Sequence, residues 1–490
     1  MTINSKLISN ALTNPSGTVR QQRRQLLRAF WLLITVLFIL ELCSIHTSSI
    51  ANIVGAILIA FAALLPLYLW CSGSALGMPI FPVFAMTYLW THALPLVGEQ
   101  PQLLVYSPTQ IFLASVTVSA FLLLGTFTWF RFVKSPPVAL KSYRVFRGQD
   151  SDGFLLFILA ADLFFNIYSV AGWFVLAGGT FTLIRSAILG LDVLSVFVLS
   201  YRCGTKELSE NKSKLFLLLL VLSLIVNAAS LLLVGVLSIG FLAVIAFTLG
   251  RRRVPWMPII IVLICVWLLH YGKGEMRAKY WGKLHFVQPW EYPALYTEWI
   301  GYSFDYLKHK DYLHESEEKG SLLERSSVIQ TLLLAQAKTP RDVPYLFGKT
   351  YAIIPEVLVP RIFNPKKIIS HEGTSLLNIH YGLQTREATL TTTIGWGLLS
   401  EAYANFGFLG CAGLAIILGA AYGQASRWSI NTPLFSFRSL FAVILISFAF
   451  QTEWTAGVYF AALFQSLAVL GVISLVFMKN YKTRDNSEFQ

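Results

Sequence analysis

The stretch that decides the fold is "LFLLLLVLSLIVNAASLLLVGVLSIGFLAVIAFTLGRRR", residues 215–253. It holds two apolar runs that are joined by a turn of only Asn227 to Ser230 and are followed by three arginines. A helix needs roughly 20 apolar residues to cross a hydrocarbon core about 30 Å thick. Each run is close to that length, so the stretch predicts two membrane-spanning helices that run in opposite directions.

Similar apolar runs recur along the whole chain. Its 490 residues are 55% hydrophobic and 13% charged, a composition typical of a polytopic membrane protein. We therefore predict an all-α fold with about twelve spans, and the tight turn at 227–230 leaves counts of eleven and thirteen open. The predicted spans are residues 29–46, 51–71, 78–97, 110–130, 153–176, 180–200, 214–229, 232–250, 255–271, 404–423, 438–452 and 457–478.

The distribution of positive charge predicts the orientation of these spans. Loops rich in lysine and arginine stay in the cytoplasm. Basic residues precede span one and follow spans four, six, eight, ten and twelve, whereas the opposite short loops, such as Gly98–Gln102, have none. This pattern predicts that both termini are cytoplasmic. It also explains the formal net charge of +13 as orientation, so the charge gives no support for binding to nucleic acid.

One connection is much longer than a turn. Residues 272–403 contain no predicted span, and the alternation of sides places them outside the cytoplasm. The chain thus divides into residues 1–271 with spans one to nine, this loop, residues 404–478 with spans ten to twelve, and a cytoplasmic tail at 479–490. A loop of this length is normally functional. Within it, Ser321–Pro340 predicts an amphipathic helix that ends before the proline.

The loop is rich in groups that could bind an anionic substrate. The planar fork of arginine suits bidentate contact with phosphate or pyrophosphate. The alternative is that some of these cations pair with lipid headgroups. The substrate-binding candidates in the loop are Arg277, Arg325, Lys366, Lys367 and Arg386, and Arg361 is a candidate catalytic cation.

His371 with its neighbour Glu372, His380 and Glu401 are the candidates for a general base. Histidine titrates near neutral pH, which suits proton transfer. Glu401 lies at the outer entry of span ten, where a carboxylate is costly unless it is paired or faces a wet cavity. A solvated histidine and an ion-paired glutamate are the structural alternatives, so the choice of base stays open. The sequence contains no metal-ligand or cofactor motif, and no cofactor is expected.

Four ionisable residues lie within predicted spans: Glu41, Asp162, Arg185 and Asp192. Such residues are expensive in a membrane and are functional candidates by default. For Glu41 and Asp162 we expect structural pairing across helices, for example Asp162 with Arg185. For Arg185, near the outer end of its span, we expect substrate binding.

Two segments of the chain carry a family resemblance. "PYLFGKTYAIIPEVLVPRIFNPKK", residues 344–367, leads to "TTTIGWGLLSEAYANFGFLG", residues 391–410. Together they resemble the loop and the exit helix of bacterial oligosaccharide repeat-unit polymerases of the O-antigen polymerase type, which are related to the O-antigen ligases. The resemblance covers roughly residues 270–425.

The resemblance implies a membrane glycosyltransferase of GT-C-like architecture in the bacterial inner membrane. It would join polyprenyl-pyrophosphate-linked oligosaccharides at the outer leaflet by metal-independent, inverting transfer. Arg361 and Lys366 would contact pyrophosphate, His371 or Glu401 would accept the proton, and Tyr403 and Asn405 would bind substrate. Implied partners are membrane lipids, a chain-length regulator and a flippase.

The sequence also allows other interpretations of the protein's function. An O-antigen ligase would differ only in its acceptor. A flippase or transporter fits twelve spans, but transporters usually contain internal repeats, and none is visible here. A non-catalytic scaffold would need no cation cluster.

Overall fold

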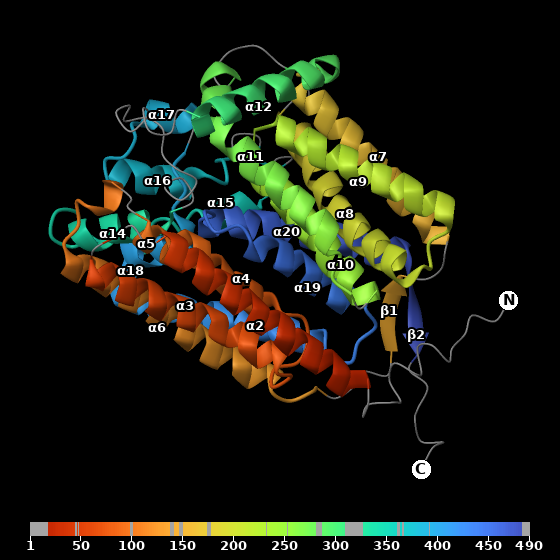
Figure 1. Cartoon of the computed structure of the whole chain (residues 1–490), viewed down its shortest axis with the longest axis horizontal. Helices are drawn as coiled ribbons and strands as arrows, with labels where there is room; N and C mark the ends of the chain where they lie inside the picture. The colour runs from red at the N-terminus through yellow and green to blue at the C-terminus, as the bar shows by residue number, and fades with distance from the viewer. Residues whose placement is uncertain are drawn as a thin grey trace. The chain divides into compact units, whose positions relative to one another are not determined.

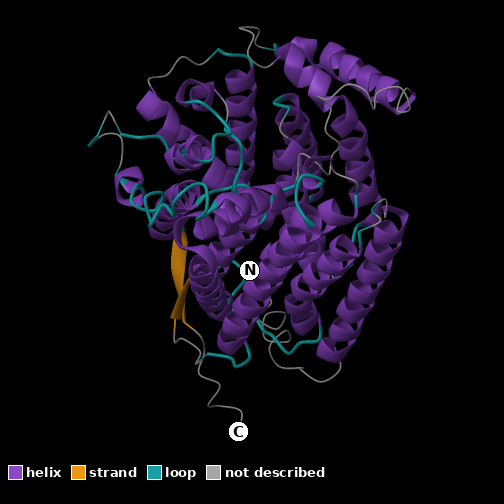
Figure 2. Cartoon of the chain, turned by 90° about the vertical axis from the view of Figure 1, so that its left-hand side faces the viewer, coloured by secondary structure: helices purple, strands orange, loops and turns teal. Residues whose placement is uncertain are grey.

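The computed structural model is almost entirely helical (Figure 1). It describes residues 18–44, 47, 49–98, 101–137, 142–146, 150–173, 178–231, 233–251, 253–280, 287–308, 327–359, 363–364, 367–391 and 393–482. Within these residues, the only strands are β1 (Ser142–Phe146) and β2 (Met478–Lys482), which pair antiparallel (Figure 2). The predicted all-α fold class is confirmed.

Helices overlap all twelve predicted spans. They are α2 (Thr18–Ser44), α3 (Ile50–Cys71), α4 (Ile80–Tyr88) continued by η1 (Leu89–Ala93) and α5 (Leu94–Val97), α6 (Pro108–Val133), α7 (Asp150–Val170), α8 (Gly178–Thr205), α9 (Glu210–Ala229), α10 (Leu233–Arg251), α11 (Trp256–Tyr280), α18 (Gly397–Trp428), α19 (Phe437–Ala449) and α20 (Ala456–Val476). Among the described residues, eight helices are long and apolar enough to cross a membrane. The chain is therefore a multi-pass membrane protein.

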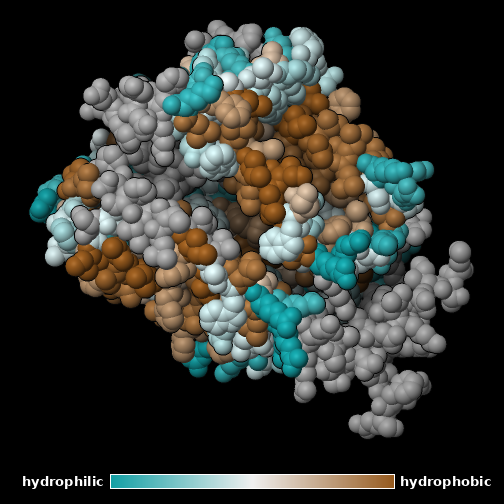
Figure 3. Space-filling view, viewed as in Figure 1, coloured by the Kyte–Doolittle hydropathy of each residue, from teal (hydrophilic) through white to brown (hydrophobic). Residues whose placement is uncertain are grey.

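The surface of the protein agrees with its assignment as a membrane protein. Large apolar side chains stand exposed along the helices, for example Phe61 at 64% and Met257 at 70%. In the space-filling view, hydrophobic residues cover the helix sides and hydrophilic ones gather near helix ends (Figure 3). Lipid, unlike water, tolerates such a surface.

Two helices extend beyond the predicted spans into the long loop. α11 continues to Tyr280 rather than ending at residue 271, and α18 begins at Gly397 rather than residue 404. Hydropathy detects only the apolar part of a helix, whereas Lys273, Glu275 and Arg277 are polar but good helix formers. The extension of α11 packs on α12, where Ser303 Oγ accepts a hydrogen bond from Gly272 N at 3.0 Å.

The loop between α11 and α18 contains short elements and one longer helix. These are η3 (Pro289–Glu291), α12 (Tyr292–Lys308), α14 (Ile329–Lys338), α15 (Ile354–Leu358), α16 (Glu372–His380) and α17 (Arg386–Thr391). The amphipathic helix predicted from Ser321 is present in part as α14, which ends before Pro340 as predicted but begins only at Ile329; Ser327 and Val328 precede it without helical structure, and residues 321–326 lie outside the described residues.

The chain divides into two compact units. Unit 1 comprises Met1–Val138, Ser327–Gly348 and Leu377–Asn431. Unit 2 comprises Ala139–Ser326, Lys349–Leu376 and Thr432–Gln490. The long loop thus contributes to both units.

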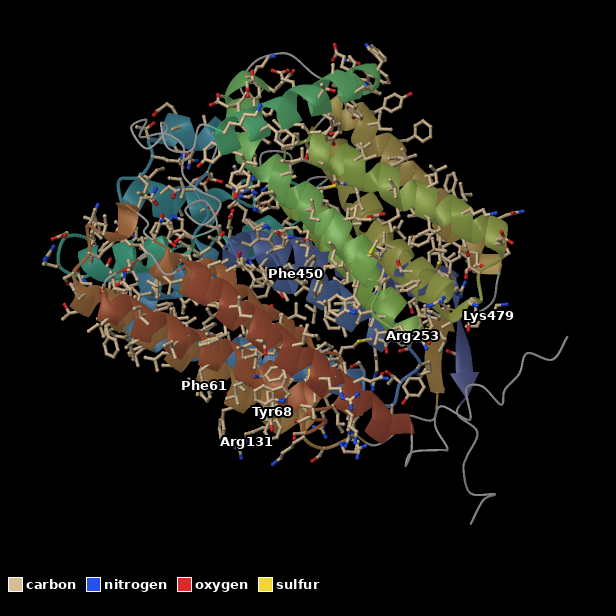
Figure 4. The ribbon with its side chains drawn as sticks, in the orientation of Figure 1. Phe61, Tyr68, Arg131, Arg253, Phe450 and Lys479 are labelled. Carbon is tan, nitrogen blue, oxygen red and sulfur yellow. The ribbon has the colours of Figure 1, made fainter. Side chains whose placement is uncertain are left out.

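Unit 1 is built on α18 and α6, which pack along each other. Small residues let the two backbones approach: a Cβ on Gly419 would lie 2.6 Å from the carbonyl oxygen of Gly125. At one end of the unit, Ser429 Oγ accepts a hydrogen bond from Met78 N at 2.8 Å, next to the basic residues Arg131 and Arg427 near the ends of α6 and α18. Figure 4 labels Arg131 there. The first turns of α6 and α18 lie at the opposite end.

Unit 2 is built on α8, which packs against α7, α10 and α20. The basic segments of unit 2 meet at one end of the unit. Arg202 of α8 forms an ion pair with Asp152 and stacks on Phe435, whose carbonyl accepts from Phe146 N of β1. The ends of α8 and α10 are in contact there, and Figure 4 shows Arg253 and Lys479 toward this end.

Candidate functional site

The eleven predicted site residues fall in both units. Unit 1 holds Glu401, Tyr403, Asn405 and Arg386. Unit 2 holds His371, Lys367, Arg277, Arg185, Arg325, Arg361 and Lys366. Of these, Arg325, Arg361 and Lys366 lie outside the described residues, and so does the side chain of Arg185.

The central feature of unit 1 is a break in α18. Gly407 has φ 61° and ψ −144°, which is far from helical. Only glycine adopts this region of backbone space readily. The break frees carbonyl groups one turn earlier, and these need new donors because the segment is buried.

Those donors come from the loop. Leu346 N donates to the carbonyl of Ala404 at 3.0 Å, and Phe347 N donates to the carbonyl of Asn405 at 3.1 Å. Gly348 N donates to Oδ1 of Asn405 at 2.9 Å. The segment Leu346–Gly348 is therefore hydrogen-bonded onto the broken helix, and the two stretches that carry the family resemblance are in direct contact.

Asn405 connects the two sides of this junction. Besides accepting from Gly348, its Nδ2 donates to the carbonyl of Glu401 at 2.8 Å. Its side chain is fully buried. The sequence predicted substrate binding for Asn405, and the structure gives its amide these two backbone partners.

Tyr345 packs against the break. A Cβ on Gly407 would lie 2.9 Å from the hydroxyl oxygen of Tyr345. The ring of Tyr345 also lies 6.5 Å from that of Tyr403, which is buried. Tyr403 thus forms part of the packing that holds the loop segment.

A layer of buried polar groups surrounds the first turns of α18. Glu401 and Ser400 are fully buried. The hydroxyl of Thr331 on α14 bonds Ser400 Oγ at 3.0 Å and the carbonyl of Trp396 at 3.1 Å. Trp396 Nε1 in turn donates to Oδ1 of Asn378 on α16 at 2.7 Å. Three elements, α14, α16 and α18, are therefore joined by hydrogen bonds at the first turns of α18, where Glu401 is buried.

The loop segment is also held from its other side. A ring nitrogen of His380 lies 2.9 Å from the carbonyl oxygen of Pro344. Tyr381 shares a hydrogen bond with Thr339 at 2.6 Å, and its carbonyl accepts from Lys338 Nζ at 3.1 Å. Burial raises the pKa of Tyr381, so its hydroxyl stays protonated. Arg386 begins α17 and is exposed.

Sequence reasoning missed His92, which lies in the π-turn η1. It is 2% exposed, its Nδ1 lies 2.8 Å from Thr91 Oγ1, and the ring of Tyr88 stacks on it at 4.3 Å. Thr91 is linked to α14 because its carbonyl accepts from Val328 N at 3.0 Å. π-turns often mark functional positions, and a lone histidine in an apolar span was the available signal.

In unit 2, the side chains of Lys367 and Arg277 donate hydrogen bonds to backbone carbonyl groups. Lys367 Nζ donates to the carbonyl of Val359 at 2.7 Å, across the proline-broken segment, whose described residues between α15 and α16 are not helical. His371 is exposed and precedes α16. Arg277 donates through Nη2 at 2.9 Å and Nε at 3.3 Å to the carbonyl of Leu231, in the turn between α9 and α10.

Glu453 was also missed by sequence reasoning. It lies in the turn between α19 and α20, near the cations Lys273 and Arg277 of α11. Its side chain is exposed, yet desolvation by the surrounding protein raises its pKa, and the two cations oppose the rise. The feature of the sequence that could have revealed Glu453 is an acidic residue in a short loop that is predicted to face outward.

The described residues contain no group of three His, Cys, Asp or Glu side chains that could hold a metal ion. Comparison with family models, curated proteins and solved structures finds no match for this chain.

Proposed function

We propose that this chain is a membrane glycosyltransferase that polymerises polyprenyl-pyrophosphate-linked oligosaccharide repeat units into surface polysaccharide. One observation carries the proposal: the loop segment Leu346–Gly348 is hydrogen-bonded onto the break of α18, one helical turn after the buried Glu401, whose backbone carbonyl accepts from Asn405. Catalysis needs such preorganised groups, and irregular backbone at the end of a membrane helix is tolerated where protein buries it.

The proposed setting is the bacterial inner membrane, crossed by twelve spans in a GT-C-like arrangement. Both termini are cytoplasmic in this proposal, and the long loop faces the outer leaflet. Within unit 1, the break of α18 lies at the end away from Arg131 and Arg427. That placement supports an outward site, because basic ends favour the cytoplasm.

The proposed reaction is an inverting displacement. The hydroxyl oxygen of the acceptor sugar attacks the anomeric carbon of the donor, and the bond from that carbon to the pyrophosphate oxygen breaks. Glu401 or His371 takes the hydroxyl proton. Arg361 and Lys366 stabilise the departing pyrophosphate, with Arg185, Arg277, Arg325, Lys367 and Arg386 as further cations for the lipid-linked substrates.

Other residues of the site position rather than react. Asn405 and Tyr403, which we propose as substrate-binding residues, also hold the loop segment on α18. Exposed apolar helix faces provide surface for the polyprenyl chains. A chain-length regulator and a flippase are the proposed protein partners.

The test is a deletion strain complemented with variants, with surface polysaccharide displayed on a gel. Glu401→Gln and Arg361→Ala should each abolish the polymer ladder while single repeat units still reach the surface. Glu210→Gln, an exposed carboxylate on α9, is the matched control and should restore the ladder. Membrane levels of each variant are measured in parallel.

Three other results would contradict the proposal. A ladder of normal length with Arg361→Ala and Glu401→Gln would exclude their catalytic roles. Loss of all surface glycan with lipid-linked units retained inside would indicate a flippase. Free polymer that is not attached to lipid core would indicate a ligase.

A further inference from the structure

The antiparallel pair α7 and α8 brings two carboxylates to the same level inside unit 2. Near one end of the pair, Asp152 of α7 meets Arg202 of α8 in an ion pair. Asp162 lies ten residues further along α7, and Asp192 lies ten residues back along α8. The two residues therefore face the same level, and their charges are close enough to interact.

Asp162 and Asp192 lie far from the ends of the helix pair. Ten residues of helix rise about 15 Å, at about 1.5 Å per residue. That distance from the Asp152–Arg202 ion pair is roughly half of a hydrocarbon core about 30 Å thick. The carboxylates are 1% and 3% exposed, respectively. Isolated charges at such a position are very costly.

Polar atoms at this level lack partners. Asn166, one turn from Asp162, donates from Nδ2 to its Oδ2 at 2.8 Å. Among the described residues, Oδ1 of Asp162, Oδ1 of Asp192 and Oγ of Ser195 have no hydrogen-bond partner. Ser195 is fully buried and lies one turn from Asp192 on the same face of α8, with its side chain leaning toward that residue.

Ser195 shares its unpartnered state with other buried helical hydroxyls, among them Ser200 of α8 and Ser223 of α9. A second group of buried hydroxyls bonds the carbonyl four residues earlier, as Ser115, Ser119 and Thr126 do at 2.7–2.8 Å. Ser195 makes no such bond in the described structure. What sets Ser195 apart is its place one turn from Asp192: its oxygen and one oxygen of each carboxylate have no hydrogen-bond partner among the described residues.

The packed helices offer little compensating charge at this depth. α20 has no charged residue, and those of the other neighbours lie near helix ends, far from the level of the pair. They are Glu210, Lys212 and Lys214 on α9, Arg251 on α10, Arg438 on α19, and Asp150, Asp152 and Arg202 on α7 and α8. Arg185 also belongs to α8 and lies two turns from Asp192, but its side chain is outside the described residues. Two buried carboxylates this close cannot both stay ionised without a cation.

We propose that Asp162, Asp192 and Ser195 form a site in unit 2 for one small monovalent cation, a proton or a sodium ion. Hard cations prefer such oxygen ligands. Asn166 holds the carboxylate of Asp162 in place. This site is separate from the groups to which sugar transfer is assigned, so it does not depend on the proposed function.

Purified full-length protein in detergent allows a test that does not read enzymatic activity. If the ligand is a proton, infrared difference spectra will show a protonated carboxyl band that titrates with pH. If it is sodium, the unfolding midpoint will rise with sodium chloride and not with choline chloride at equal ionic strength. The sodium response should be lost in both Asp162→Asn and Asp192→Asn, the carboxyl band should change its intensity or its titration in both, and Glu210→Gln should keep either signal unchanged.

Two outcomes would overturn the site. One is a wild-type protein with neither signal, a result that needs no variant to fold. The other is a signal that is unchanged in Asp162→Asn and Asp192→Asn. Ser195→Ala keeps both carboxylates and serves as a milder variant, which should weaken the sodium response or shift the titration of the carboxyl band.

Discussion

Oδ1 of Asn405 accepts a hydrogen bond from the backbone N–H of Gly348 at 2.9 Å, although 57 residues separate them. The same side chain donates to the carbonyl of Glu401. One amide thus joins the long loop to the first turns of α18.

Asn405→Ala should therefore loosen the loop segment. It leaves the Gly348 N–H without this acceptor and removes the side-chain bond to the Glu401 carbonyl, and an unsatisfied buried donor costs about 1–3 kcal/mol. We expect a lower unfolding midpoint in detergent and loss of the polymer ladder. Equal midpoints for wild type and Asn405→Ala would contradict the role assigned to Asn405.

Gly407→Ala tests the break in α18. The backbone there has φ 61°, and the added Cβ would meet the hydroxyl of Tyr345. Strain of this kind costs about 1–3 kcal/mol. We expect reduced stability, measured by thermal unfolding. Gly413→Ala in the same helix is the matched control, because a Cβ at Gly413 meets nothing within 4 Å. Equal effects of the two substitutions would show that the break is not required.

These two positions show what the sequence could predict. Helices were found at all twelve predicted spans because about 20 consecutive apolar residues are a local signal. The break at Gly407 is set by contacts with residues 345–348, which no local pattern reveals. The glycine of "NFG" is visible in the sequence, but its contact with Tyr345 cannot be inferred from spacing.

The intramembrane charges show the same limit. We expected Asp162 to pair across helices, for example with Arg185, whose side chain lies outside the described residues. In the structure Asp162 accepts from Asn166 and lies level with Asp192. The register between α7 and α8 decides which residues face each other, and hydropathy carries no information about register.

Arg277→Ala should destabilise the turn between α9 and α10. Leu231 is 2% exposed and has φ 61°, and its carbonyl accepts both hydrogen bonds from the Arg277 guanidinium. Loss of the charged donor should cost about 1–3 kcal/mol, measured as a lower unfolding midpoint. Lys279→Ala on the same helix is the control, because its pair with Glu298 is exposed and such pairs contribute roughly 0–1 kcal/mol. An effect of Lys279→Ala as large as that of Arg277→Ala would argue against the turn as the cause.

Glu453 should make stability depend on pH with the opposite sign to an ordinary paired carboxylate. Desolvation raises its pKa in the folded protein above the ordinary 4.5, so the folded protein binds this proton more tightly than the unfolded chain does. The resulting stabilisation is complete below about pH 4.5 and is lost as the pH rises through the folded pKa. Glu453→Gln removes the cost of the charge, so this variant should unfold at a higher temperature than wild type at neutral pH, and the difference should shrink in acid.

Glu387 provides the control for that experiment. Its own backbone N–H and the hydroxyl of Thr385 hold its pKa below the ordinary value, so its stabilisation is present at neutral pH and is lost in acid. Glu387→Gln should therefore unfold at a lower temperature than wild type at neutral pH, and the two should converge as the pH falls. Unfolding midpoints of wild type and both variants, measured from about pH 4 to pH 8, give the comparison. Parallel curves for wild type and Glu453→Gln would mean that Glu453 is fully hydrated in the folded protein.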